Sequence, residues 1–303
     1  MSLTEKVQRW ISDPPPTYLF EITETSLASV SPRNPTAQRR ELLTERGLSV
    51  SPSATNVLKP HLYRDALQRV IPENGARRRA AALIVPDYAV RMALLDFEQF
   101  PSGPAERAAL LRFRLRKSVP FHIEEAQLSY AIQAQTGERV EVLAVAIARP
   151  ILEEYEGLVT EAGFRLGLVV PSCLAALRLC EERQPGLTLL MKAAGATISV
   201  VLTEGGRVRL IRCLDLTGNE QEEERSEGDI VLPLLQQTIA YSEDQLGKAV
   251  ARVLLCGFGP ETETVVKVIT QELGITSAPV RSRFGTASHD NAGLLGLLER
   301  YAA

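Results

Sequence analysis

The strongest constraint on the fold is an order of elements that the sequence predicts twice. Around residues 17–85 the pattern indicates a strand, a returning strand, a helix with one apolar face, and an apolar run that ends at a proline. Around residues 187–273 a strand, a hairpin, a helix, a buried strand and a helix follow, and the hairpin turns at Glu204-Gly205-Gly206-Arg207. This repetition predicts an α/β fold with two related halves.

Within the first unit, most segments match one element each. Residues 17–22 and 26–30 are predicted as strands, residues 61–71 as a helix, and residues 80–85 as a strand that is buried on both faces. Residues 31–40 are rich in proline and arginine, so a polar loop is expected there.

The chain divides into an extension and two halves of unequal build. Residues 1–16, which end in three prolines, form an N-terminal extension. The first half, residues 17–185, contains a predicted α+β insertion at about residues 90–168, and the second half covers residues 186–303. The insertion is expected to contain a helix, a hairpin and a second helix, at residues 104–118, 127–134 with 140–148, and 150–162.

Composition excludes several classes of protein. The 303 residues carry a net charge of −3, which argues against a nucleic-acid backbone binder. No apolar run approaches the roughly 18 residues that a membrane span needs. The four cysteines are scattered in apolar stretches without a C-x-x-C pair, which favours a reduced cytoplasmic interior.

The sequence offers no metal site and no catalytic triad. His61, His122 and His289 lie far apart, and none is followed by a second ligand at metal-binding spacing. No G-x-S-x-G motif marks a nucleophile. We therefore expect neither a bound metal nor hydrolytic chemistry.

Several stretches in the first two thirds of the chain carry a family resemblance. They are Ala81-Ala82-Leu83-Ile84-Val85-Pro86, Asp96-Phe97-Glu98-Gln99-Phe100-Pro101, Lys117-Ser118-Val119-Pro120-Phe121 and Glu161-Ala162-Gly163-Phe164. Their order resembles PilM, the actin-like cytoplasmic protein of type IV pilus assembly, and its relative, the cytoplasmic part of the type II secretion protein GspL. The resemblance implies duplicated actin-like (ribonuclease H-like) domains with a small α+β insertion in the first half.

The resemblance also places a nucleotide pocket, in an altered form. In actin-like proteins two hairpins each present Asp-x-Gly to the phosphates, where Gly allows close approach and Asp organises Mg²⁺. Here Glu21-Ile22-Thr23 and Lys192-Ala193-Ala194 stand at those places. A third element, Gly257-Phe258-Gly259, would face the adenosine or would simply be a packing turn. Glu21, Lys192, Gly257 and Gly259 are therefore candidates for a vestigial nucleotide pocket.

The length of the second half also argues for an altered nucleotide pocket. The family usually inserts a subdomain that closes over the nucleotide, and here only the acidic residues 220–229 precede a helix predicted over residues 230–246. With two phosphate motifs altered and one wall absent, the resemblance implies a pseudo-ATPase without an ATP cofactor. An ATP-binding ATPase or small-molecule kinase of the same superfold is the alternative.

One helix combines basic and apolar residues. Arg112, Phe113 and Arg116 belong to a predicted helix that is rich in arginine, with leucines interleaved. These residues form either a solvated face over a packed stripe or a contact for an acidic peptide or anionic lipid headgroups. We take them as candidates for partner binding.

Together these features predict a non-catalytic adaptor in the cytoplasm, peripheral to the inner membrane. The resemblance implies that it docks the tail of a bitopic, PilN-like membrane protein in a groove between the first half and its insertion. The expected groove walls are residues 90–97 and 107–121. A polymer-forming protein is a further alternative, and self-association remains open.

Overall fold

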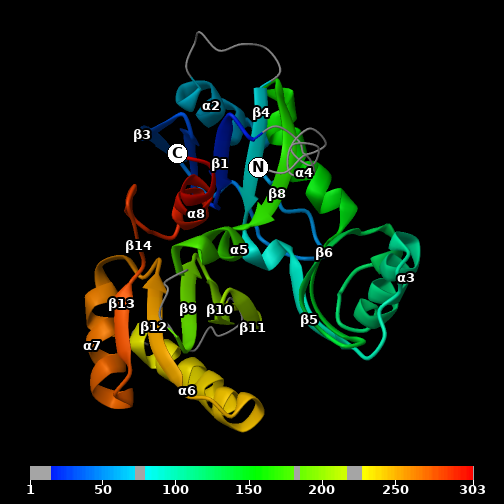
Figure 1. The fold of residues 1–303 in the computed structure, drawn as a ribbon. Coiled ribbons are helices and arrows are strands. Elements are labelled where there is room, and N and C mark those ends of the chain that lie inside the picture. The colour runs from blue at the N-terminus through cyan, green and yellow to red at the C-terminus, as the bar shows by residue number, and fades with distance from the viewer. Residues whose placement is uncertain (1–14, 72–78, 181–184, 217–226, 303) are drawn as a thin grey trace, which may run out of the picture.

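The computed structural model describes residues 15–71, 79–180, 185–216 and 227–302, and of residues 227–230 the backbone alone. Nearly all of the N-terminal extension and residues 220–226 of the acidic segment lie outside this part. Figure 1 shows one sheet above the other, with a smaller lobe beside them. None of the described helices is long and apolar enough to cross a membrane.

The first sheet has five strands in the order β3-β2-β1-β4-β8. The strands are β1 (Tyr18–Ile22), β2 (Ser26–Ser31), β3 (Asn34–Leu42), β4 (Arg79–Val85) and β8 (Phe164–Pro171). The first three run antiparallel in chain order, whereas β1, β4 and β8 are parallel.

The polar loop expected over residues 31–40 is wrong, because most of this segment forms β3. β3 lies at the edge of the sheet and its residues are all partly or fully exposed. An edge strand that buries neither face lacks the apolar alternation that identifies a strand in a sequence. Its pairing with β2 is what holds it in place.

The second sheet repeats the first in the order β11-β10-β9-β12-β13. Its strands are β9 (Leu187–Ala194), β10 (Thr197–Glu204), β11 (Arg207–Asp215), β12 (Val250–Cys256) and β13 (Thr276–Pro279). The pairing directions are also the same, with an antiparallel meander followed by two parallel strands. The predicted duplication is therefore confirmed.

Helices cover the outer faces of the sheets and fill the space between them. α2 (Pro60–Val70) and α4 (Arg149–Glu161) pack on the first sheet, and α6 (Glu227–Leu246) and α7 (Thr262–Leu273) pack on the second. Between the sheets lie α5 (Ser172–Ala176) and α8 (Ala292–Tyr301), which cross closely at Gly296. A Cβ at Gly296 would stand 2.0 Å from the Ala175 carbonyl oxygen.

The two inner helices tie the halves together. α8 comes from the second half but packs on Leu19, Ala82 and Ile84 of the first sheet. α5 follows β8 of the first half, yet its residues Cys173 and Ala176 pack with strands of the second sheet. Each half therefore contributes a helix to the core of the other.

The third lobe is an antiparallel sheet in the order β5-β7-β6, covered by one helix. Its elements are β5 (Arg91–Phe97), α3 (Pro104–Leu115), β6 (Gln127–Thr136) and β7 (Arg139–Ile147). The insertion is thus narrower than the expected residues 90–168, because β8 pairs with β4 and α4 packs in the core of the first sheet. Which sheet a strand joins depends on pairing between distant segments, and the sequence pattern does not show this.

Short elements complete the chain. They are β14 (Arg281–Ser282), β15 (Gly285–Thr286) and the 3-10 turns η1 (Asp87–Ala89), η2 (Ile123–Glu125), η3 (Leu177–Cys180) and η4 (Gly259–Glu261). Among them η1 belongs to the candidate site described below, because it follows β4 and brings Asp87 to the boundary between the two sheets.

Candidate functional site

A cavity of about 230 Å³ lies between the turns of the two halves, and we call it the inter-sheet cavity. Glu21 and Thr23 from the first half and Lys192 and Gly195 from the second are among its lining residues. The turns come close together, since a Cβ at Gly195 would stand 2.6 Å from a carboxylate oxygen of Glu24. The structure thus brings Glu21-Ile22-Thr23 and the segment that begins at Lys192 to one place.

The first turn contains no glycine and is kept tight by a side chain. Thr23 stands at the end of β1, and its hydroxyl accepts a hydrogen bond from the Ser26 backbone N–H at 3.1 Å. Such a turn replaces backbone freedom by a local side-chain hydrogen bond. Thr23 Oγ1 and Ser26 Oγ are also within hydrogen-bonding distance, at 2.7 Å.

Lys192 forms a buried ion pair across the two halves. Its Nζ atom lies 3.3 Å from Oδ2 of Asp87, and the two side chains are 1% and 2% exposed. Asp87 also accepts hydrogen bonds from the Ser199 hydroxyl at 2.8 Å and from the Cys173 backbone N–H at 2.7 Å. A buried ion pair of this kind persists only where further hydrogen bonds satisfy its atoms, as they do here.

Glu21 is the second buried acid of the site. Its carboxylate accepts backbone N–H groups at the start of α8, from Leu294 at 2.8 Å and from Gly293 at 3.3 Å. The Ser172 hydroxyl also donates to it. Glu21 therefore binds the N-terminal end of α8, where unpaired N–H groups favour negative charge.

The charges of the site depend on one another. Burial lowers the pKa of Lys192, but the Asp87 and Glu21 carboxylates raise it more, so the pKa lies above the ordinary value. Burial raises the pKa of Glu21, and Lys192 and the hydrogen-bond donors offset only part of that rise. The ammonium group of Lys192 is thus the cation that two buried acids share.

Glu21→Gln is expected to become more stable relative to the wild type as pH rises. Because the pKa of Glu21 is raised from 4.5 in the folded state, the native protein binds this proton more tightly than the unfolded chain. The associated stability is present below pH 4.5 and is lost as pH rises through the folded pKa. Glutamine does not titrate, so urea unfolding between about pH 4 and about pH 8 should show the difference.

Glu45→Gln is a matched control for this experiment. Glu45 is 53% exposed and pairs with Lys59 at the surface, so its replacement should have a small effect throughout. If Glu21→Gln instead lost stability relative to the wild type as pH rises, the carboxylate would be favoured in the fold and the assignment would be wrong.

The two predicted glycines do not line the inter-sheet cavity. Gly257 has a φ of +88°, and a Cβ there would stand 2.0 Å from the Ala193 carbonyl oxygen. Gly259 has a φ of +51°, with no atom within 4 Å of a Cβ. Gly257 therefore lies directly against the end of β9, next to Lys192, and has a packing role.

Asp87, Ser172 and Ser199 belong to the site, and our reading of the sequence missed them. One signal was present: a lysine within the otherwise apolar stretch 189–194 calls for a buried acid. Asp87 was one candidate for this acid, because it stands two positions after the apolar run 80–85. Among the described residues, no group of three or more His, Cys, Asp or Glu could hold a metal ion.

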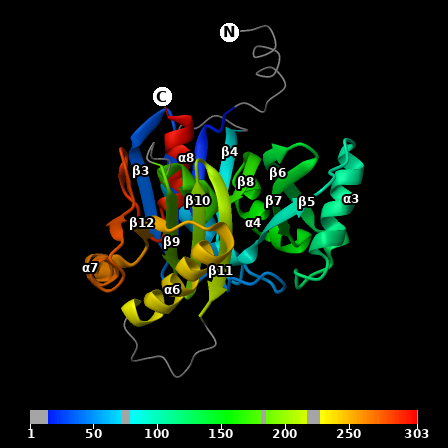
Figure 2. The ribbon, with the colours of Figure 1, turned by 60° about the horizontal axis from the view of Figure 1, so that its bottom comes forward.

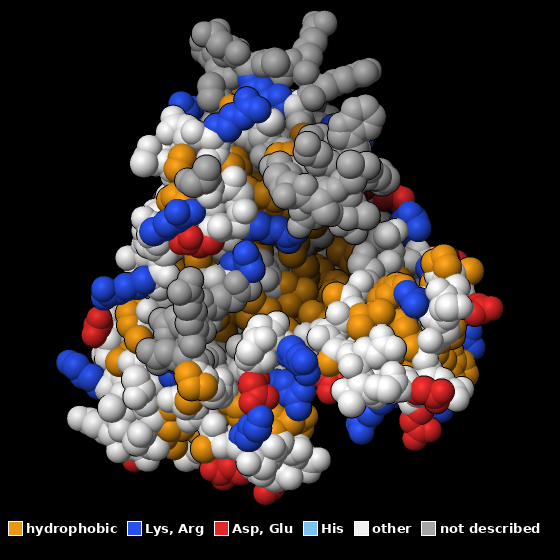
Figure 3. Space-filling view, viewed as in Figure 1, with side chains coloured by type: hydrophobic (Ala, Val, Ile, Leu, Met, Phe, Trp, Pro, Cys, Tyr) orange, Lys and Arg blue, Asp and Glu red, His pale blue; other side chains and the backbone are white. Residues whose placement is uncertain are grey.

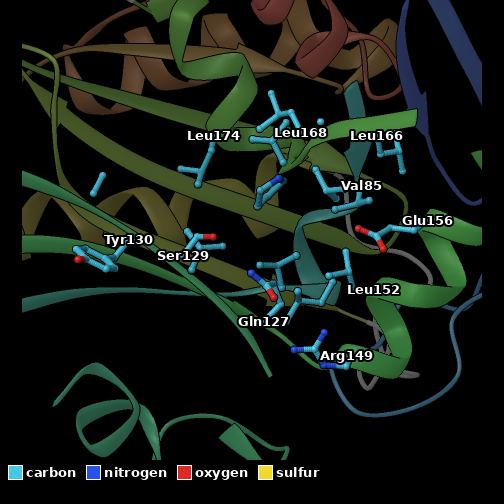
Figure 4. Close-up of a pocket in the computed structure, with 18 of the residues that line it drawn as sticks. Val85, Gln127, Ser129, Tyr130, Arg149, Leu152, Glu156, Leu166, Leu168 and Leu174 are labelled. Carbon is cyan, nitrogen blue, oxygen red and sulfur yellow. The ribbon is translucent and has the colours of Figure 1, made fainter. Parts of the chain in front are cut away.

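A second and larger hollow lies between the first sheet and the insertion, and we call it the apolar groove. It measures about 650 Å³ and appears as an orange hollow in Figure 3. Leu166 and Leu168 of β8, Ser129 of β6 and Leu152 of α4 line it (Figure 4). β8 and β6 are each the last strand of their sheet, so both sheets end at this groove.

The walls of the groove differ from those expected from the sequence. Along β7, Val140, Val142, Ala144 and Ala146 pack toward α3, whereas Leu143, Val145 and Ile147 line the groove. Because strand residues alternate between faces, α3 lies on the opposite side of this sheet. Of the expected walls, only Val90 lines the groove.

Arg112, Phe113 and Arg116 therefore do not line the groove. Arg112 and Phe113 belong to α3, whose residues Leu111 and Leu115 are buried against the insertion sheet, and Arg116 follows directly as the C-cap of this helix. Phe113 is 71% exposed, and Arg116 pairs with Glu124 at 2.5 Å. The structure places these three residues together, on a different surface from the groove.

Comparison with known proteins identifies the fold. No protein-family model matches the sequence, and no curated protein matches it either. A chain in the solved PilM-PilN type IV pilus biogenesis complex matches with a TM-score of 0.74 at 21% identity, covering 96% of this chain and 100% of that one. A Bacteroides thetaiotaomicron protein with an actin-like ATPase fold and unknown function matches with a TM-score of 0.51 at 15% identity, covering 94% and 96%.

A third solved structure is more distant. The cytoplasmic domain of EpsL, an inner membrane component of the type II secretion system of Vibrio cholerae, has a TM-score of 0.46 at 12% identity and covers 78% of this chain and 80% of its own. A TM-score of 0.46 is too low to support a conclusion about the fold of this chain. From the repeated sheets and the two stronger matches we conclude that the chain has the actin-like fold and is similar in structure to PilM.

Proposed function

We propose that this chain is a non-catalytic adaptor of a type IV pilus or type II secretion-like assembly. It binds the cytoplasmic tail of a bitopic, PilN-like inner-membrane protein, and therefore works in the cytoplasm at the surface of that membrane. The observation that carries the proposal is the apolar groove, which ends two sheets and is large enough for a short peptide segment.

The groove suits an extended or helical peptide. Partly buried apolar side chains from β7 and β8, among them Val145, Leu166 and Leu168, can pack against those of a bound peptide. The outer edges of β6 and β8 can also pair with a peptide backbone, which is a common mode of recognition. Arg149 and Glu156 add charged groups from α4 (Figure 4).

The structural likeness supports the choice of partner. The matching chain with the highest TM-score quoted above comes from a complex of PilM with PilN, whose function is type IV pilus biogenesis. The likeness at 21% identity concerns the fold, so the partner is our proposal for this chain. A PilN-like tail is the natural first ligand to test.

The inter-sheet cavity supports the non-catalytic part. Mg²⁺ would need carboxylates that are free to bind it, whereas Asp87 is already paired with Lys192. An ammonium group at this place would also repel the metal ion. The residues present therefore do not fit a magnesium nucleotide. A rise of several degrees in Tm with Mg-ATP would overturn this part and favour the ATPase or kinase alternative.

Calorimetric titration with a synthetic tail tests the adaptor role. The ligand is a synthetic peptide with the sequence of the N-terminal cytoplasmic segment of a PilN-like bitopic protein from the same organism. We expect a Kd in the low-micromolar range or below, about −8 kcal/mol or stronger. Ser129→Trp should weaken binding at least roughly tenfold, because Ser129 is an exposed position of β6 and tryptophan would fill the groove.

Ser102→Trp is the matched control, since Ser102 is also exposed and does not line the groove. It should bind the tail like the wild type. If the calorimetric titration detects no binding of the tail peptide to the wild-type protein, the adaptor proposal is contradicted. Equal weakening by both variants would place the tail elsewhere.

A further inference from the structure

The outward side of α3 and of the turn that follows it combines an exposed aromatic ring with basic side chains, and we call this surface the α3 face. Phe113 is 71% exposed, the highest value among the large apolar side chains that stand exposed in the described part of the chain. Four basic residues lie within four positions of it, namely Arg112, Arg114, Arg116 and Lys117. The opposite side of the helix is buried through Leu111 and Leu115.

The positive charge of this face is largely uncompensated. Within the described residues, the structure pairs Arg116 with a carboxylate, that of Glu124, and gives Arg112, Arg114 and Lys117 no such partner. The guanidinium of Arg114 lies over the Phe97 ring at 5.1 Å, which leaves its charge in place. Residues 104–126 hold five basic and three acidic residues, whereas the whole chain has a net charge of −3.

The shape of the α3 face decides between an acidic peptide and anionic lipid headgroups as its partner. Figures 1 and 2 both show α3 at the outer edge of the molecule, with no other element over its outward side. A peptide is normally bound in a groove or along a sheet edge, and a single outlying helix provides neither. A flat anionic surface needs only a convex basic face with an interfacial aromatic residue.

We propose that the α3 face binds the anionic headgroups of a lipid bilayer, with the Phe113 ring entering the interface between headgroups and acyl chains. The proposal rests on the proposed function, because a chain bound to the short tail of a bitopic protein works beside a membrane. The groove would then hold the protein partner, while the α3 face orients the chain on the bilayer. The two surfaces lie on opposite sides of the insertion sheet.

The expected binding is weak and depends on charge. Each basic side chain close to an anionic membrane strengthens binding roughly fivefold. Surface charge interactions are screened over about 10 Å at 0.1 M salt, so binding should fall steeply between about 0.05 M and about 0.5 M NaCl. Such weak contacts become important when a second interaction already holds the protein at the membrane.

Vesicle sedimentation with the full chain, without any tail peptide, tests the proposal. The vesicles contain phosphatidylcholine and phosphatidylglycerol in equal amounts, and phosphatidylcholine alone for comparison. We expect binding to the anionic vesicles only. Arg112→Gln with Lys117→Gln should weaken it roughly 25-fold, and Phe113→Ser should weaken it severalfold.

Lys267→Gln with Arg281→Gln is the matched control, because it removes the same charge from exposed positions in the second half. This double variant should bind like the wild type, and if it lost binding equally, net charge rather than the α3 face would be responsible. Equal binding to neutral vesicles, or unchanged binding by the α3 variants, would overturn the proposal.

Two other results, each indicating a different partner for the α3 face, would also overturn the membrane-binding proposal. Tight binding of a polyglutamate peptide that is insensitive to Phe113→Ser would indicate an acidic protein partner. A wild-type dimer that Phe113→Ser dissociates in the absence of vesicles would indicate a second copy of this chain. Tail binding in the groove, measured without vesicles, reports on the proposed function separately.

Discussion

Lys192→Met is expected to lower the free energy of unfolding by about 3–5 kcal/mol, because it leaves the Asp87 carboxylate buried without its cation. Glu21, which shares the ammonium group, loses a favourable interaction as well. The deficit should shrink at acidic pH, because the pKa of Glu21 is raised by burial and its protonation removes one of the two buried negative charges. Urea unfolding at neutral pH and at about pH 4 measures both effects.

Two further variants make this result interpretable. Lys248→Met removes a surface lysine that is 54% exposed and pairs with Glu204, and should cost less than about 1 kcal/mol. Adding Asp87→Asn to Lys192→Met removes the unpaired charge, so the double variant should recover part of the loss. If Lys192→Met were as mild as Lys248→Met, the ion pair would not stabilise the boundary between the halves.

Gly257→Ala is expected to cost roughly 3 kcal/mol. At a φ of +88° an alanine incurs about 1–2 kcal/mol of backbone strain. The added methyl group, 2.0 Å from the Ala193 carbonyl oxygen, would also force the β12 turn away from the end of β9 at an overpacking cost of about 1–3 kcal/mol. Thermal or urea unfolding provides the measurement.

Gly259→Ala separates the two contributions to this loss. Its φ of +51° carries the backbone strain, but no atom lies within 4 Å of the new Cβ. It should therefore cost about 1–2 kcal/mol, clearly less than Gly257→Ala. Equal losses in the two variants would mean that the contact with Ala193 has no energetic role, and a packing function for Gly257 would be disproved.

Elements whose cause is local were predictable. The hairpin at Glu204-Gly205-Gly206-Arg207 forms between β10 and β11 because glycines supply the left-handed turn, and both have positive φ. The helix expected over residues 61–71 forms as α2, with its apolar stripe buried. The strand expected over residues 80–85 is buried, as its unbroken apolar run indicates.

Features that depend on distant pairing were not predictable in the same way. β3 has no apolar alternation, since it lies exposed at a sheet edge. β8 belongs to the first sheet rather than to the insertion because of its pairing with β4. The side of the insertion sheet on which α3 lies follows from the packing of Val142 and Ala144, and this moved the predicted partner residues out of the groove.

The sequence by itself determined the repeated order of elements and the lysine at position 192, because hydrophobic period, turn glycines and residue identity are local properties. The tertiary structure alone decided that Lys192 meets Asp87, which lies 105 positions away, and that Gly257 supports the end of β9. It also decided where the apolar groove lies. Contacts between distant segments arise only when two sheets and their crossing helices pack together, and burial then makes each charge depend on its partner.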